Sequence, residues 1–188
     1  MKKILIKEIT TKIFSGGTPS TQNQEYWDGE YNWLSSGETK NKFILKTDKT
    51  ITKEGIDNSS TKLSLPGDIL IASAGQGQTR GQVSYNCIKT YINQSIICLR
   101  ANHELINSKY LFYNLSTKYD LLRQLSDANS IRGSLTTKLV ADLEINIHNI
   151  DMQQHIVNIN IMFPLFQLYQ QWISYTYCKL QLIVFQHY

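Results

Sequence analysis

The chain has 188 residues, of which 41% are hydrophobic and 18% are charged, and its formal net charge is +4. A chain of this length can bury one core and one appendage, so we expect one globular domain followed by an extension, and the composition argues against disorder. No stretch reaches the roughly 20 apolar residues of a membrane span, and the first residues, MKKILIKEIT, hold too short an apolar run for a signal peptide. The three cysteines match neither a CxxC motif nor a cluster of metal ligands, so we expect a cytoplasmic, reduced protein.

Basic residues are concentrated in one part of the chain. Between Gln76 and Lys138, eight Lys and Arg residues stand against three Asp and Glu residues, a surplus of five. Such an asymmetry suits a polyanion, most often nucleic acid, although an ordinary solvated face gives the same count. A nucleic acid is therefore one candidate partner.

Residues 30–102 are predicted to be mostly β-structure. SGGTPS at 15–20 is a turn cluster, and YWDGEYNWLS at 26–35 places aromatic residues around a turn that leads into a strand. Further strands are predicted at 68–73, 80–86 and 93–102, and the middle one alternates polar and apolar residues as a half-buried strand does.

The hydrophobic period then becomes helical. A helix is predicted from Asn107 or Ser108, either of which can cap its first turn. Its buried face would carry four leucines: Leu111, Leu115, Leu122 and Leu125. A shorter helix is expected at 134–143 and a strand directly after it, which makes residues 1–151 an α+β domain.

Residues 152–188 have a different pattern. Apolar residues recur at alternating spacings of four and three, with a polar interruption at Gln170, which is the seam of a coiled coil. An amphipathic helix packed on its own domain is the alternative, because Pro164 should kink or interrupt the helix. An exposed apolar seam favours a symmetric homodimer. The interface residues expected are Ile156, Ile159, Phe163, Phe166, Gln170, Ile173, Tyr177 and Leu180.

The segment LPGDILIASAGQGQTRGQVSYN at 65–86 contains a glycine-rich loop between two predicted strands. Its GxGxxxG spacing departs from the dinucleotide-binding fingerprint, and no helix N-terminus follows to hold a phosphate. We interpret the glycines as permitting a tight irregular turn that lifts polar side chains off the sheet edge. Glutamine and arginine can make paired hydrogen bonds to base edges, so the loop is predicted to read bases or a groove. The residues concerned are Gln76, Gln78, Thr79 and, above all, Arg80.

Other residues are predicted to contact the DNA backbone or to complete the interface. Lys40 and Lys42 follow the strand at 31–35, and with Lys138 they are the expected phosphate contacts. The DNA-binding set also includes Thr18, Ser36 and Arg132.

No catalytic motif stands out. A nuclease centre combines Asp with Glu-x-Lys around a metal, and the chain holds Glu38, Lys40 and Asp68 in the reverse of the usual order, for which chance is a sufficient explanation. The sequence has no methyltransferase Asp/Asn-Pro-Pro-aromatic motif and no GxSxG, and its four histidines lack metal-ligand spacing. We predict no catalytic residue, no metal and no cofactor, with a small nuclease or modification enzyme kept as the alternative.

Five segments in chain order resemble the DNA specificity subunit of Type I restriction-modification systems. They are SGGTPS, YWDGEYNWLSSGE, LPGDILIASAGQGQTRGQVSYN, NQSIICLRA and LTTKLVADLEINIHNIDMQQHIVNI. The resemblance implies a target recognition domain with a small twisted, mostly antiparallel β-sheet and packed helices, followed by a long C-terminal coiled-coil helix at 152–188. The family usually carries two of each, so the chain looks like a half subunit.

The resemblance also implies a function without catalysis. A specificity subunit would place methyltransferase subunits, and through them the restriction subunit, on a bipartite DNA target. A silent recognition cassette that folds but assembles with nothing is a further alternative.

Overall fold

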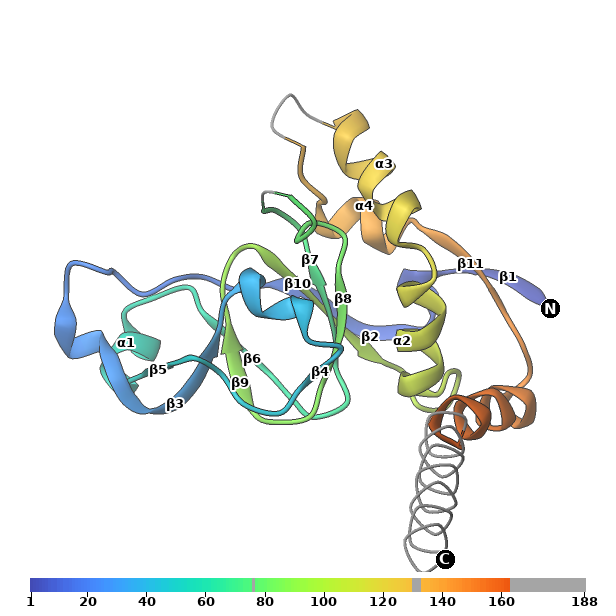
Figure 1. The fold of residues 1–188 in the computed structure, drawn as a ribbon, viewed down its shortest axis with the longest axis horizontal. Helices are drawn as coiled ribbons and strands as arrows, with labels where there is room; N and C mark the ends of the chain where they lie inside the picture. The colour runs from blue at the N-terminus through green and yellow to red at the C-terminus, as the bar shows by residue number, and fades with distance from the viewer. Residues whose placement is uncertain (76, 130–132, 163–188) are drawn as a thin grey trace, which may run out of the picture.

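The computed structural model describes residues 1–75, 77–129 and 133–162 (Figure 1). In these residues eleven strands form three sheets, not the single small sheet that was expected. Six of the eight strand pairings are antiparallel and two are parallel. The predicted α+β class is confirmed, while the number of sheets was predicted wrongly. No helix of this part of the chain is both long and apolar enough to cross a membrane.

Figure 1 shows the largest sheet in the middle, between a second sheet and the helices. The five-stranded sheet has the order β2 (Thr10–Ser15), β10 (Ile96–Ala101), β7 (Ile69–Ala72), β8 (Val83–Asn86) and β4 (Phe43–Ile44). The four-stranded sheet has the order β5 (Lys49–Ile51), β3 (Trp27–Leu34), β9 (Thr90–Ile92) and β6 (Lys62–Ser64). The third sheet pairs β1 (Lys2–Leu5) with β11 (Glu144–Ile147).

The helical elements are short. The 3-10 helices are η1 (Ile6–Glu8), η2 (Gln24–Tyr26) and η3 (Ser36–Lys40). The α-helices are α1 (Lys53–Asp57), α2 (Ser108–Ser116), α3 (Tyr119–Asn129) and α4 (Thr137–Ala141). A further helix runs over residues 150–162, where the described part of the chain ends.

Both faces of the five-stranded sheet are buried. Ile97 and Leu99 of β10 belong to the larger core, together with residues of α2 and α4. Cys98 points to the other face, where a smaller core includes Leu34 and Ile92 of the four-stranded sheet. Burial on both faces explains why β7 is a continuous apolar run without alternation.

The helix predicted from Asn107 is divided into two. Asn107 caps α2 as predicted, because its side chain accepts hydrogen bonds from the backbone of Lys109 and Tyr110. The hydroxyls of Ser116 and Thr117 then donate to carbonyls one turn back, 2.8 Å in each case. Such local bonds compete with regular helix hydrogen bonding, so α2 ends there and α3 starts at Tyr119.

The buried carboxylate of Asp68 joins the two larger sheets. Asp68 has a side chain only 3% exposed, and it accepts hydrogen bonds from Arg100 Nε at 3.0 Å and Nη2 at 2.8 Å. The same carboxylate accepts from Ser64 of β6 and from the Leu65 amide. Cys98 also lies against Asp68, and burial, followed by this negative charge, raises the pKa of its thiol well above the usual value.

Asp68→Asn tests this link. The substitution keeps the shape but removes the charge that faces Arg100, so we expect a loss of about 2–3 kcal/mol in the free energy of unfolding, measured by urea denaturation. Asp57→Asn is the matched control, because Asp57 pairs with Lys53 on the surface and should leave unfolding unchanged. Equal effects of the two variants would contradict the role given to Asp68.

Candidate nucleic-acid interface

The loop between β7 and β8 is the glycine-rich segment, and it lies beside α3 (Figure 1). Gly75, Gly77 and Gly81 all have positive φ, so the predicted tight irregular turn is confirmed. At Gly81 there is also little room, because a Cβ would lie 3.2 Å from Arg123 Cγ. The loop therefore needs glycine both for its backbone conformation and for its approach to α3.

Two side chains of α3 hold the loop backbone. Arg123 Nη1 donates to the Gly77 carbonyl at 2.5 Å and to Tyr119 Oη at 3.1 Å. Tyr119 Oη in turn donates to the Gln78 carbonyl at 3.0 Å. The Arg123 guanidinium also lies 5.7 Å from the centre of the Tyr119 ring. Gly77 and Gln78 are thus held through their carbonyls, and the Gln78 side chain is exposed.

Arg80 lies inside the contact between the loop and α3. Its guanidinium pairs with Asp127 and donates from Nη1 to the Gly133 carbonyl at 2.9 Å, and its side chain is 12% exposed. That Arg80 reads a base stays a prediction. Base reading would require these internal contacts to be exchanged for contacts with DNA.

Three of the predicted DNA-binding residues line one groove of about 380 Å³. They are Lys40, Lys42 and Gln78. Thr39, Gln82 and Tyr119 complete much of the wall. Because both lysines are exposed, the groove combines mobile positive charge with the fixed loop.

Helix capping and hydrogen bonds from β8 hold the segment that carries Lys40 and Lys42. Ser35 and Glu38 form a capping box on η3, and Glu38 also accepts from the Asp48 amide at 2.9 Å. Ser84 of β8 bonds to the carbonyls of Thr39 and Asn41 at 3.0 and 2.8 Å. These bonds fix the backbone on both sides of Lys40.

The remaining predicted residues are placed elsewhere or lie outside the described residues. Thr18 donates to Gln94 at 2.6 Å, and Ser36 is half-buried in η3. Lys138 is exposed but pairs with Asp142 at 2.6 Å, and this bond, then the one from Lys7, lowers the pKa of Asp142 to about 2. None of these three is among the residues lining the groove. Gln76 and Arg132 lie outside the described residues, as do the seam residues from Phe163 onward.

Fewer unpaired positive charges lie on the surface than the excess of Lys and Arg in the sequence suggests. Arg80, Arg100 and Lys138 each face a carboxylate, and Arg123 donates to backbone. Tyr119 and Arg123 were not predicted to be functional. Their spacing of four residues on a predicted helix places them next to each other on the helix surface, and this spacing could have indicated that they contact a common partner.

The residues of the alternative nuclease centre have structural partners. As whole residues, Glu38 and Asp68 are 7% and 2% exposed; Glu38 caps η3 and Asp68 pairs with Arg100. No group of three or more His, Cys, Asp or Glu side chains suited to a metal ion occurs within the described ranges. The geometry therefore does not favour the nuclease alternative.

Comparison with known proteins gives consistent matches. The family described as "Type I restriction modification DNA specificity domain" matches residues 1–169. The chain is 28% identical over 151 residues to the Type I restriction enzyme EcoR124I/EcoR124II specificity subunit of Escherichia coli, covering 79% of this chain and 37% of that protein. It is 25% identical over 162 residues to the MjaIX specificity subunit of Methanocaldococcus jannaschii, covering 82% of this chain and 35% of that protein.

Solved structures show a similar fold. The HsdS subunit from Thermoanaerobacter tengcongensis matches with a TM-score of 0.62 at 18% identity, over 90% of this chain and 37% of that one. The S subunit of a Type I restriction-modification system from M. genitalium matches with a TM-score of 0.62 at 15% identity, over 90% of this chain and 40% of that one. The chain thus spans well under half the length of the proteins that it matches.

Arg123→Gln tests the contact between α3 and the loop. Loss of the bond to Gly77 should let the loop open more often, so we expect amide hydrogen exchange at Gly81 and Gln82 to become about tenfold faster. Gln124→Ala, an exposed neighbour on α3, is the control and should leave exchange unchanged. Unaltered protection in Arg123→Gln would mean that the loop holds its conformation by itself.

Proposed function

The chain belongs to the family of Type I restriction modification DNA specificity domains, and on that premise we propose that it is a non-catalytic DNA-recognition protein. It reads part of a bipartite duplex target and directs methyltransferase subunits, and through them the restriction subunit, to that target. The observation that carries the proposal is the groove in which Lys40, Lys42 and Gln78 come together beside the glycine-rich loop.

The groove has the two kinds of group that DNA recognition needs. Exposed lysines bind phosphates without regard to sequence, and they fix the register of the protein on the duplex. Gln78, on a loop held through the carbonyls of Gly77 and Gln78, offers side-chain hydrogen bonds to base edges, and Thr79 follows it just outside the groove lining. A loop already fixed in the free protein loses little conformational entropy on binding, which favours affinity.

Arg80 has two roles in this proposal. In the free protein it holds the loop against Asp127 and Gly133. On the cognate sequence it exchanges these partners for a base or a phosphate. Breaking the bonds to Asp127 and Gly133 would cost free energy on every DNA sequence. The compensating gain would come only where a guanine edge accepts two hydrogen bonds from the guanidinium.

Assembly is proposed to use the helix that starts at residue 150. One side of it packs on the domain, with Gln153 and Val157 at 1% and 2% exposure and Ile156 half-buried. Met152 and Ile159, at 45% and 52%, form an exposed apolar flank next to that side. This flank supports a homodimer through a second helix, in which two half subunits supply the two recognition domains.

The proposed location follows from the DNA partner: a protein that acts on DNA with methyltransferase and restriction subunits works in the cytoplasm.

The first turns of the helix pack on the recognition domain, since Gln153 accepts a hydrogen bond from the Asn107 amide at 2.9 Å. The proposed boundary at residue 151 therefore separates the DNA-reading domain from the dimerisation helix in function, although the start of the helix packs on the domain.

Salt dependence of DNA binding tests the function. If Lys40 and Lys42 each contact a phosphate, Lys40→Gln/Lys42→Gln should reduce the slope of log K against log salt by about 2. The control, Lys2→Gln/Lys46→Gln, removes two exposed lysines outside the groove and should keep the slope. A slope near zero for the unaltered chain would rule out DNA as the partner. DNA binding that depends steeply on salt, without co-purification of a methyltransferase subunit, would support the silent recognition cassette instead.

Sedimentation tests the homodimer. Ile159→Glu places a charge on the exposed apolar flank, so it should raise the dimer dissociation constant at least about tenfold. Asn158→Glu adds the same charge at an exposed polar position one residue away and should leave the dimer intact. A monomer at micromolar concentration for the unaltered chain would exclude the dimer.

A further inference from the structure

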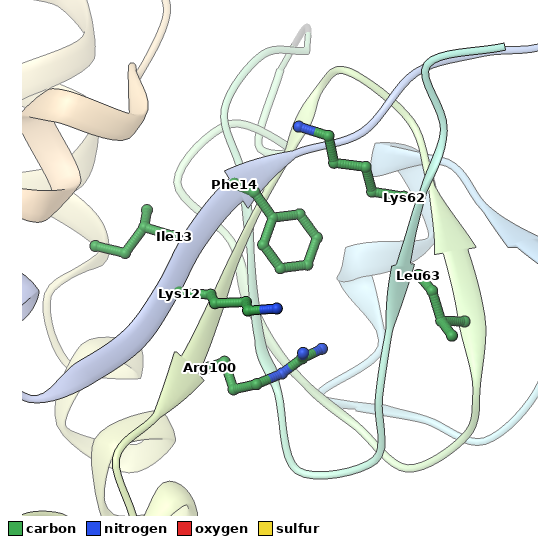
Figure 2. Close-up of a pocket in the computed structure, with 6 residues that line it drawn as sticks. All are labelled: Lys12, Ile13, Phe14, Lys62, Leu63 and Arg100. Atoms are coloured by element: carbon green, nitrogen blue, oxygen red, sulfur yellow. The ribbon is translucent and has the colours of Figure 1, made fainter.

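A second groove, of about 400 Å³, lies between the two larger sheets at the edge away from Lys42 (Figure 2). We name it the Phe14 groove, after the ring at its centre. Its lining residues come from β2, β6 and β10: Lys12, Ile13, Phe14, Lys62, Leu63 and Arg100. β2 and β6 are the outer strands of their sheets, so the groove is bounded by two sheet edges.

Strand register brings the charged groups together. Lys12 pairs with Arg100 and Phe14 with Cys98, so all four side chains point to one face of the five-stranded sheet. Figure 2 shows the Phe14 ring with Lys12 and Arg100 on one side and Lys62 on the other. The Arg100 guanidinium lies 5.9 Å from the ring centre.

Arg100 is fixed before any partner arrives. Its Nε and Nη2 are bound to Asp68, which lies behind it and is almost fully buried. Nη1 has no hydrogen-bond partner among the described residues, and the side chain is 23% exposed. Lys12 and Lys62 are exposed and form no ion pair within that part of the chain. The groove thus has three positively charged side chains against the one buried carboxylate of Asp68, so its net charge is positive.

We propose that the Phe14 groove is a docking site for an acidic segment of a protein partner. An Asp or Glu side chain binds Arg100 at its unoccupied edge, and Lys12 and Lys62 flank the carboxylate. Phe14 and the partly exposed Leu63 accept an apolar neighbour of that residue. A preoriented arginine beside an aromatic ring is a common anchor in protein–protein interfaces, because the flat guanidinium matches a carboxylate.

The position of the groove favours a protein over DNA. Arg100 lies near the end of β10, whereas the glycine-rich loop leaves the sheet beside Ile96, at the other end. β2 and β4 are the opposite edges of the sheet, about 19 Å apart at ~4.8 Å per strand. A duplex held by the loop, Lys40 and Lys42 therefore lies toward the other end and the other edge of the sheet from the Phe14 groove. The recessed Arg100 also suits a narrow side chain better than a broad duplex.

The test compares two charge reversals with two probes. The full chain is titrated with a short peptide of glutamates and leucines and, separately, with duplex DNA, while the side-chain NMR signals of Arg100 are followed. We expect the peptide to shift the Arg100 signals, and Lys12→Glu/Lys62→Glu to weaken peptide binding about tenfold without changing DNA binding. Lys40→Glu/Lys42→Glu should do the reverse.

Three outcomes would overturn the proposal. The first is no binding of the peptide to the unaltered chain. The second is equal peptide binding by both variants. The third is a loss of DNA affinity in Lys12→Glu/Lys62→Glu as large as in Lys40→Glu/Lys42→Glu, which would make the groove a DNA contact. Because both altered lysines are exposed and unpaired within the described chain, thermal unfolding should show that the variant stays folded.

Discussion

The buried carboxylate of Asp68, which pairs with Arg100 of its own sheet and accepts a hydrogen bond from Ser64 of the four-stranded sheet, is the contact on which the arrangement of the two larger sheets depends. Asp68 precedes β7, Arg100 belongs to β10, and Ser64, which donates to the same carboxylate, belongs to β6. A buried charge is tolerated only with such partners, so packings of the sheets that separate them are unfavourable. The same pair fixes Arg100 in the Phe14 groove, while the opposite sheet edge carries Lys42.

Local features were predictable from the sequence. The apolar run of β7, the cap at Asn107 and the turn made by the glycines each follow from residue types within a few positions of one another. The sequence analysis predicted DNA contacts for Lys40, Lys42 and Gln78 but did not predict that the three lie close together. The structure adds that they line one groove.

Long-range pairing could not be predicted in the same way. The four-stranded sheet forms because β9 pairs in parallel with β3, far earlier in the chain, and no local pattern specifies that partner. Asp127, the partner of Arg80, lies 47 residues away, and no local pattern indicates that pairing. One local feature was also missed, because the helix divides at Ser116 and Thr117 through hydroxyl bonds that a leucine pattern does not reveal.

The bonds from Tyr119 and Arg123 to the glycine-rich loop end on carbonyl oxygens, which every amino acid carries. The side chains of the loop can therefore change during evolution while α3 goes on holding its backbone, as long as the glycines remain. Arg80 and Asp127 differ in this respect, because each requires the other's charge. Under the proposed DNA-reading role, new specificities would arise by single substitutions at Gln78 or Thr79, whereas a change at Arg80 would call for a second change in α3.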